Sequence, residues 1–165
     1  MFFFNSRLTW DLHIDFILKK SAKRFFIIYT LLRAGVSDHD IIAIYCSLIR
    51  SILEYACPVW HPGLTVKQSK QIESVQKRFL KIIFPETSYS ESLKLSGLQS
   101  LQNRREIIIK ELFQQIKKDD HPLNNLLNKR TPVNSIRDFY PYVAPVGRTN
   151  RFKKSFINYC IYKKY

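Results

Sequence analysis

Hydrophobic residues recur at helical spacing along most of the chain, and the most apolar stretch runs from Ile41 to Trp60. In a helix that starts near Asp40, more than half of the circumference is apolar. The apolar stripe consists of Ile41, Tyr45, Leu48, Ile52 and Tyr55, widened by Ile42, Ile49, Leu53 and Ala56. The residues left for water are Ser47, Arg50, Ser51 and Glu54. We predict a central helix around which the others pack, ending at Cys57-Pro58 with a rigid corner over 60–63.

One helix is predicted before this central helix and one after it. The first runs from about Asp11 to Arg33, with Thr9 as its N-cap and Gly35 as its stop. Its apolar stripe is Ile14, Leu18, Phe25, Ile28 and Leu32. Ser37 or Asp38 is expected to cap the central helix. After it, Thr65 and Gln68 form a capping box for a helix that extends to about Phe84 and buries Ile72, Val75, Phe79, Ile82 and Ile83.

Two more helices follow. Ser88 and Glu91 predict a second capping box for a short helix, Tyr89 to Ser96, which Gly97 closes. Ser100 is the expected cap of the next helix, whose stripe is Leu101, Ile108, Leu112 and Ile116. The predicted fold class is therefore all-α, a small bundle of four to five helices over residues 1–120.

From residue 121 onwards the helical pattern breaks down. Residues 122–128 are expected to form one or two further helical turns, and the prolines and polar residues over 131–150 suggest extended chain. A last helical turn is expected around Phe156, Ile157, Cys160 and Ile161. We expect residues 121–165 to be an irregular, basic and aromatic C-terminal tail.

The charge is strongly positive, with 27 Lys and Arg against 13 Asp and Glu and a net charge of +14. Such a balance favours a polyanionic partner, nucleic acid more often than a membrane surface. The predicted third helix carries a basic ridge opposite its apolar stripe, made of Lys67, Lys70, Lys77, Arg78 and Lys81. A merely solvated helix face is the alternative interpretation of this ridge.

The tail combines cations with aromatic rings. Its basic residues include Arg148, Arg151, Lys153 and Lys154, interleaved with Phe152, Phe156, Tyr159 and Tyr162. Cations for phosphates and rings for stacking are the means by which proteins hold single-stranded nucleic acid without reading sequence. The same rings could instead dock the tail onto the core, and both interpretations stay open.

Nothing in the sequence makes a positive case for catalysis. Polymerase and nuclease chemistry needs carboxylates grouped around divalent metal, and the one adjacent pair, Asp119-Asp120, is typical of a solvated helix end. The histidines are scattered, and we expect His61 to be satisfied by backbone. Cys46, Cys57 and Cys160 lack metal spacing and suggest buried free thiols in an intracellular protein of the cytoplasm or nucleus. We expect no cofactor, no metal and no membrane partner.

Several short runs of the chain form a set of motifs, of which the most specific is 48–63, LIRSILEYACPVWHPG. The other runs are 32–37 (LRAGVS), 72–78 (IESVQKR), 81–85 (KIIFP), 95–98 (LSGL), 104–106 (RRE), 121–123 (HPL) and 152–157 (FKKSFI). Together they resemble the region that follows the catalytic domain in reverse transcriptases of non-LTR retrotransposons, in the jockey-like and chicken-repeat-like group. The resemblance extends from about Leu8 to the C-terminus.

The resemblance implies a thumb and connecting region rather than an activity. In that family the polymerase aspartates, including a Tyr-x-Asp-Asp loop, lie upstream, and this sequence contains no Tyr-x-Asp-Asp. It therefore implies a catalytically incomplete, non-enzymatic C-terminal fragment with at most weak, non-specific binding of RNA or an RNA–DNA duplex. The alternatives are a helical protein–protein interaction module, self-associating through the helix face of Phe16 and Phe26, or a non-functional remnant.

Overall fold

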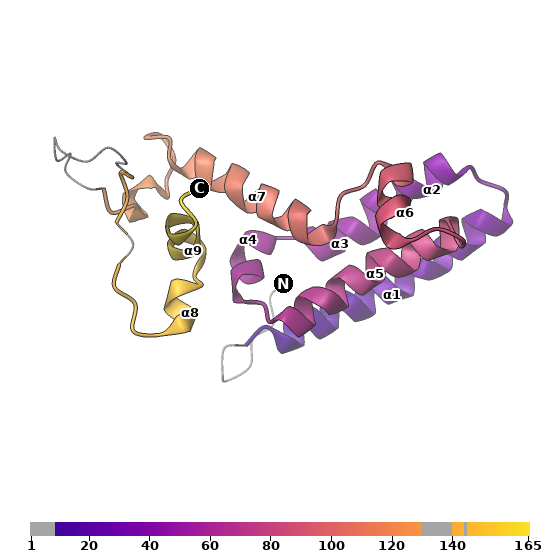
Figure 1. Ribbon diagram of the computed structural model, residues 1–165, viewed down its shortest axis with the longest axis horizontal. Helices are drawn as coiled ribbons and strands as arrows, with labels where there is room; N and C mark the ends of the chain where they lie inside the picture. The colour runs from indigo at the N-terminus through magenta and orange to yellow at the C-terminus, as the bar shows by residue number, and fades with distance from the viewer. Residues whose placement is uncertain (1–8, 130–139, 144) are drawn as a thin grey trace. The chain divides into compact units, whose positions relative to one another are not determined.

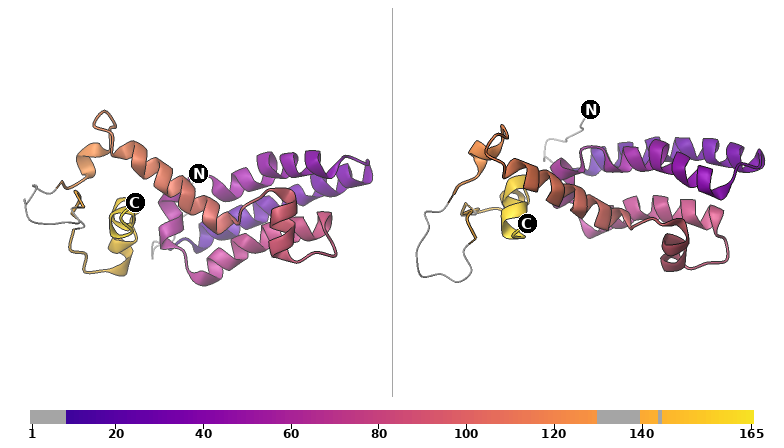
Figure 2. Two further views of the ribbon diagram at one scale, coloured as in Figure 1. Left: turned by 45° about the horizontal axis from the view of Figure 1, so that its top comes forward. Right: turned by 90° about the horizontal axis from the view of Figure 1, so that it is seen from above.

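The computed structural model describes residues 9–129, 140–143 and 145–165 and is drawn in Figures 1 and 2. These residues are largely helical and contain no strand, only an isolated antiparallel bridge between Lys129 and Tyr142. The all-α prediction is confirmed. The longer helices are α1 (Asp11–Arg33), α2 (Asp38–Tyr45), α5 (Val66–Ile83), α6 (Tyr89–Ser96) and α7 (Leu101–Ile116). The shorter ones are α3 (Ser51–Glu54), α4 (Cys57–Trp60), α8 (Asn150–Lys153) and α9 (Phe156–Tyr162), with a π-helix η1 (Cys46–Arg50) and 3₁₀ turns η2 (His61–Gly63) and η3 (Asn124–Leu126).

The chain forms two compact units. The first comprises Met1–Cys57 and Leu64–Arg105, and the second comprises Pro58–Gly63 and Glu106–Tyr165. Helix α7 contributes its first five residues to the first unit and the remainder to the second. The expected division after residue 120 falls inside the second unit, because α7 supplies core residues to what was expected to be a tail.

Helix α1 has its predicted bounds but not its predicted cap. The residue before its first turn is Trp10, and Thr9 instead donates its hydroxyl to the Asp11 carboxylate over 2.6 Å. At the other end Gly35 adopts a φ of 74°, and the amide of Val36 donates to the carbonyl of Leu31, which closes the helix as predicted. The buried residues of α1 include Ile17 and Ser21 beside Ile14, Phe25 and Ile28, while Leu18 is half-buried.

The central helix differs from its prediction because it changes helical type. Its fully buried residues are spaced four apart: Ile41, Tyr45, Ile49 and Leu53. In an α-helix a four-residue step turns about 400°, so such a row drifts by about 40° per step. The π-helix η1, whose hydrogen bonds run from i to i+5, turns less per residue and returns the row to one face. The predicted stripe was therefore wrong at Tyr55, which is exposed.

The break in this stretch comes before the predicted Cys57-Pro58 stop. Ala56 has a φ of 47°, an unusual value for a residue with a side chain, and ends the helical run after Glu54 and Tyr55. Cys57 then starts the short helix α4, and Pro58 lies in its first turn. A backbone N–H there has no partner within the helix, so the N–H that proline lacks costs no hydrogen bond. The predicted rigid corner is thus a helical turn followed by the 3₁₀ turn η2.

By length and composition, Asp38–Gly63 is the one stretch of the described chain that could cross a membrane; core helices of soluble proteins pass the same test. Within it the break at Ala56 interrupts the helix, and Glu54 forms an ion pair with Arg104 of α7, with 2.8 Å between Glu54 Oε1 and Arg104 Nε. The second guanidinium contact, from Nη2 to Oε2, is 3.1 Å long. Through Glu54 this stretch takes part in polar packing within the first unit.

Helices α1 and α5 run side by side in the first unit, and α6 packs against α5 (Figures 1 and 2). Both capping boxes, at Thr65/Gln68 and at Ser88/Glu91, are present as predicted. The Tyr45 ring stacks on the Phe79 ring of α5, with 3.9 Å between their centroids. Burial raises the pKa of the Tyr45 hydroxyl, which stays protonated.

A fully buried glutamine on α5 connects several parts of the first unit. Gln76 accepts from the Tyr45 hydroxyl (3.1 Å) and donates to the carbonyl of Gln99 (2.9 Å) and the hydroxyl of Tyr89 (3.2 Å). Tyr89 in turn donates to Glu73, whose carboxylate also accepts from the first amides of α7, those of Leu101 and Gln102. This network explains how a polar side chain occupies the apolar face of α5.

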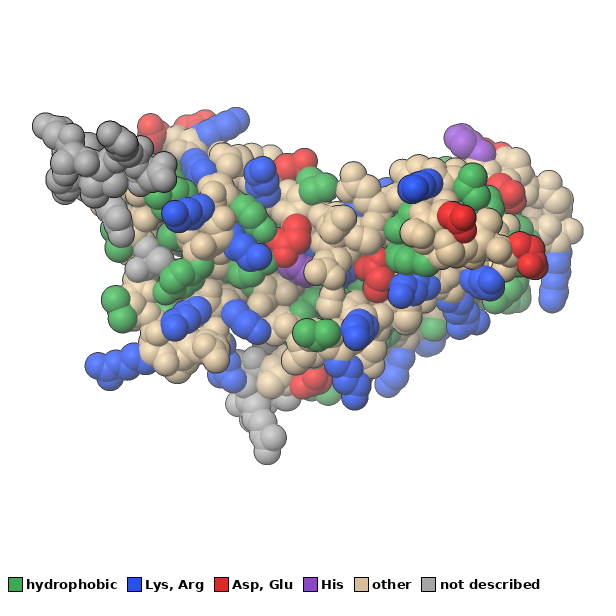
Figure 3. Space-filling model, viewed as in Figure 1, with side chains coloured by type: hydrophobic (Ala, Val, Ile, Leu, Met, Phe, Trp, Pro, Cys, Tyr) green, Lys and Arg blue, Asp and Glu red, His purple; other side chains and the backbone are tan. Residues whose placement is uncertain are grey.

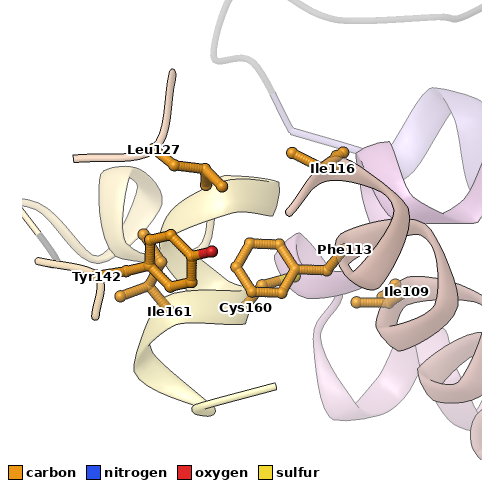
Figure 4. Packing of buried hydrophobic residues seen from close by; sticks show 7 residues of the cluster. All are labelled: Ile109, Phe113, Ile116, Leu127, Tyr142, Cys160 and Ile161. Carbon is orange, nitrogen blue, oxygen red and sulfur yellow. The ribbon is translucent and has the colours of Figure 1, made fainter. Parts of the chain in front are cut away.

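The second unit has its own hydrophobic core, shown in Figure 4. It consists of Ile109, Phe113, Ile116, Leu127, Tyr142, Cys160 and Ile161. The last helical turn predicted around residues 156–161 is confirmed as α9 and supplies Cys160 and Ile161 to this core. On α7 the predicted Ile108 and Leu112 are only half-buried, because the buried row Leu101, Arg105, Ile109 and Phe113 follows the four-residue spacing instead.

Glu106 organises the polar side of this unit. Its carboxylate accepts from the hydroxyls of Tyr159 (2.6 Å) and Tyr165 and lies 3.2 Å from Nε2 of His61. His61 thus has a side-chain partner, Glu106, that the sequence did not predict. Burial alone would raise the pKa of Glu106, but the hydrogen bonds from Tyr159, Tyr165 and His61 outweigh it and hold that pKa below the ordinary 4.5.

We predict that Gln76→Leu lowers the free energy of unfolding by about 2–4 kcal/mol, because it leaves the buried Tyr45 hydroxyl without this partner and removes the hydrogen bond to the Gln99 carbonyl. Gln102→Leu, at an exposed position of α7, is the matched control and should change stability little. Urea denaturation measures both. A Gln76→Leu variant as stable as the original chain would show that the network contributes nothing.

A second prediction concerns pH. A carboxyl whose pKa is lower in the folded state stabilises folding above its unfolded pKa, and this contribution is lost as the pH falls through the folded pKa. Glu106→Gln should therefore lower unfolding free energy near pH 7, and the difference from the original chain should shrink as the pH falls below about 4.5. Glu111→Gln, at an exposed site on the same helix, should show no such trend. A constant difference at all pH values would contradict the proposed role of the Glu106 carboxylate.

Candidate nucleic-acid interface

The five cations of the predicted ridge all lie on the exposed face of α5. Every one of these side chains is exposed: Lys67, Lys70, Lys77, Arg78 and Lys81. At 3.6 residues per turn, they fall within an arc of about 100° and span about 21 Å along the helix axis. We call this surface the α5 basic face. It contains no carboxylate, since Glu73, the one acid of α5, is turned towards Tyr89 and the start of α7.

Local sequence determines which way this face points. The Thr65 cap fixes where α5 begins, and Gln68 Nε2 donates to the Asp11 carboxylate of α1 over 2.7 Å. Phe79 and Leu80 are buried on the opposite side, together with Ile72. With the helix anchored at its start and packed along one side, the lysines are directed to solvent.

The α5 basic face has two parts with different surroundings. Lys67 and Lys70, with Val66, Gln71 and Ser74, line an open hollow near the start of the helix. Further along, Arg78 lies over the ring of Phe25, with 4.8 Å between Cζ and the ring centroid, and Lys77 lies 5.0 Å from the centroid of Tyr89. In Figure 3, Lys and Arg side chains recur over the region of α5 and α1.

The basic tail residues belong to the second unit and are described separately. Arg148, Arg151, Lys153 and Lys154 are exposed on and beside α8, which Thr149 caps by accepting from the amide of Phe152. The helix α8 itself was not predicted. Its signal in the sequence is Thr149, a residue type that commonly caps helices. The prolines that precede it favoured an interpretation as extended chain instead.

The aromatic residues of the tail divide between the two interpretations that the sequence left open. Phe156 and Tyr159 pack against the core of the second unit, and Tyr159 also bonds to Glu106. Phe152 and Tyr162 remain 45% and 48% exposed. The former pair therefore docks the tail, and only the latter pair is accessible for stacking.

The candidate chemical groups of the sequence are the cysteines and the aspartate pair. The described residues contain no group of three or more His, Cys, Asp or Glu side chains that could hold a metal ion. Burial raises the pKa of Cys57 and of Cys160 to about 12 and also raises that of Cys46, so none is an activated thiolate. Asp119 and Asp120 are exposed, and Asp119 pairs with Lys129 over 3.0 Å.

Sequence reasoning missed the residues that position the cations. Tyr89 begins α6 and Phe25 lies on α1, whereas the lysine and arginine they support lie on α5. No spacing rule within one helix connects them, so only the packing of α1, α5 and α6 shows the relationship.

The chain was compared with protein families, curated proteins and solved structures. No protein family, curated protein or solved structure matches the chain.

Proposed function

We propose that the chain binds the sugar–phosphate backbone of nucleic acid through the α5 basic face, weakly and without reading sequence. The observation that carries this proposal is the set of five exposed cations, with no carboxylate among them, along about 21 Å of one helix. Phosphates of one B-form strand follow one another at about 3.4 Å along the duplex axis, so several lie within reach of such a helix. The net charge of +14 supports the same partner.

The resemblance to non-LTR reverse transcriptases suggests the type of nucleic acid. In that family the corresponding thumb region grips the backbone of the template–primer duplex, and we propose an RNA–DNA duplex or RNA as the ligand here. We propose no polymerase activity for this chain, because no Tyr-x-Asp-Asp loop occurs in it. The tail cations at Arg148, Arg151, Lys153 and Lys154 would add non-specific contacts.

A second candidate function is protein–protein interaction through α1. Leu12, Phe16 and Phe26 are 50%, 39% and 76% exposed, and at 3.6 residues per turn they lie within about 80° on one face. Lys19 and Lys23 lie between them on the same face and are exposed. Two copies joined through this face would bring these lysines together, so self-association would be weakened by charge repulsion at low salt.

Salt therefore separates the two candidates. Light scattering over a range of protein concentrations, at low and at high salt, measures self-association. A dimer that forms only at high salt would favour the α1 face, whereas nucleic-acid binding should be strongest at low salt. A chain that stays monomeric throughout would exclude self-association through α1.

The main prediction is that replacing Lys70, Lys77 and Lys81 together with Gln weakens binding to RNA–DNA duplexes of every sequence alike. Because three phosphate-binding cations are removed, the slope of log K against log salt should become shallower by about 2 to 3. Fluorescence anisotropy of a labelled duplex over a salt series measures this slope.

The matched control replaces Lys94, Lys110 and Lys118, three exposed lysines outside the α5 basic face, with Gln. It changes the net charge equally and should retain most of the slope. If both triple variants lose the same amount, the total charge and not the α5 basic face determines binding. Absence of binding by the original chain at low salt would overturn the proposed function.

A further inference from the structure

The distal part of the α5 basic face borders a hollow between α5 and α6. The hollow has a volume of about 410 Å³. Its lining residues are Lys77, Arg78, Leu80 and Lys81 of α5 with Thr87, Tyr89 and Ser92. We call it the α5–α6 hollow. Three of its seven lining residues are cations and none is an acid, so its electrostatic field favours an anion.

The cations of the hollow are held in place by neighbours that do not neutralise them. Lys77 is supported by the face of the Tyr89 ring, and Arg78 by the ring of Phe25, which is itself buried. Lys81 donates one hydrogen bond to the carbonyl of Pro85. An ammonium has three donors and a guanidinium five, so each cation keeps N–H groups for a ligand. A cation restrained in this way loses less conformational entropy on binding.

The hydroxyls of Ser92 and Thr87, which line the hollow, already have hydrogen-bond partners within the protein. Ser92 Oγ donates to the carbonyl of Ser88 over 2.9 Å, and Thr87 Oγ1 lies 2.6 Å from Ser92 Oγ. These hydroxyls therefore shape the hollow, while the cations supply the attraction.

Three acids lie near the hollow in sequence: Glu73, Glu86 and Glu91. Glu86 is exposed and directly precedes Thr87 of the lining. Glu73 accepts from Tyr89 and from two amides at the start of α7. Glu91 accepts from the amide and the hydroxyl of Ser88, which cap α6, and these bonds lower its pKa. None of the three lines the hollow. Within the lining itself, no acid balances the three cations.

We infer that the α5–α6 hollow is a phosphate-binding site, with Lys77, Arg78 and Lys81 as its ligands to the phosphate oxygens. Arg78 is suited to contact two oxygens at once, while the two lysines act as point charges. This inference rests on the proposed function, and the bound group would be a phosphodiester of the nucleic-acid backbone. Lys67 and Lys70, outside the hollow, would then make looser contacts to neighbouring phosphates.

The test uses the full chain labelled with ¹⁵N and titrated with inorganic phosphate at constant ionic strength, with chloride as the exchanged anion. We expect saturable shifts of the amide signals of Thr87, Tyr89 and Ser92. Arg78→Gln should weaken the apparent affinity about tenfold, and Lys81→Gln should do the same without disturbing the Arg78–Phe25 contact. Lys94→Gln, an exposed lysine of α6 outside the hollow, is the control and should bind as the original chain does.

The outcomes separate this inference from the proposed function. If the amide signals do not shift saturably, or if the three variants bind phosphate equally, the inference is wrong, even where RNA–DNA duplexes still bind to the α5 basic face. If phosphate binds in the hollow but no duplex binds at low salt, the hollow recognises free phosphate and the proposed function is wrong. Thermal unfolding of each variant verifies that the fold is retained.

Discussion

The contact of Tyr45 with α5 determines which side of that helix meets solvent. The Tyr45 ring stacks on Phe79, and its hydroxyl donates to Gln76, so an apolar and a polar contact hold the same two helices together. Both partners on α5 are fully buried. Because side chains half a turn away must then point outwards, the cations of the α5 basic face are exposed as a consequence of this packing.

This arrangement in turn depends on the π-helix η1. A regular α-helix would carry the four-residue row from Ile41 to Leu53 gradually away from the core, and the wider turn over Cys46–Arg50 corrects the drift. The same correction leaves Glu54 facing Arg104, so that α3 and α7 are joined by an ion pair. Gln76 and Glu73 extend the polar contacts to α6 and to the start of α7. The packing of the helices in the first unit thus depends on a few buried polar groups as well as on the apolar core.

The sequence predicted most of the helices because their ends carry local signals. The capping boxes at Thr65 and Ser88, and Gly35 and Gly97 beyond the helix ends, act within a few residues, and the structure has each of them. The π-helix, the break at Ala56 and the burial of Arg105 could not be predicted in this way, because they depend on contacts between helices distant in sequence. The same holds for Glu106, whose partners His61, Tyr159 and Tyr165 lie 45 or more residues away.

The candidate site, too, was predicted only in part from the sequence. A helical pattern alone showed that Lys70, Lys77 and Lys81 share one face, and the structure exposes all three. The pattern could not predict the α5–α6 hollow, or that the rings of Phe25 and Tyr89 contact two of the cations. In the tail, the mixture of rings and cations did not reveal which rings are buried, since Phe156 and Phe152 differ only in what packs beside them.

Lysine footprinting in the presence of an RNA–DNA duplex tests the central claim most directly. The chain is acetylated at low salt with and without duplex, and the modified lysines are quantified by mass spectrometry. We predict protection of Lys67, Lys70, Lys77 and Lys81, with Lys94, Lys110 and Lys118 modified equally in both samples. Uniform protection of all the exposed lysines, or protection confined to Lys153 and Lys154 of the tail, would contradict binding through the α5 basic face.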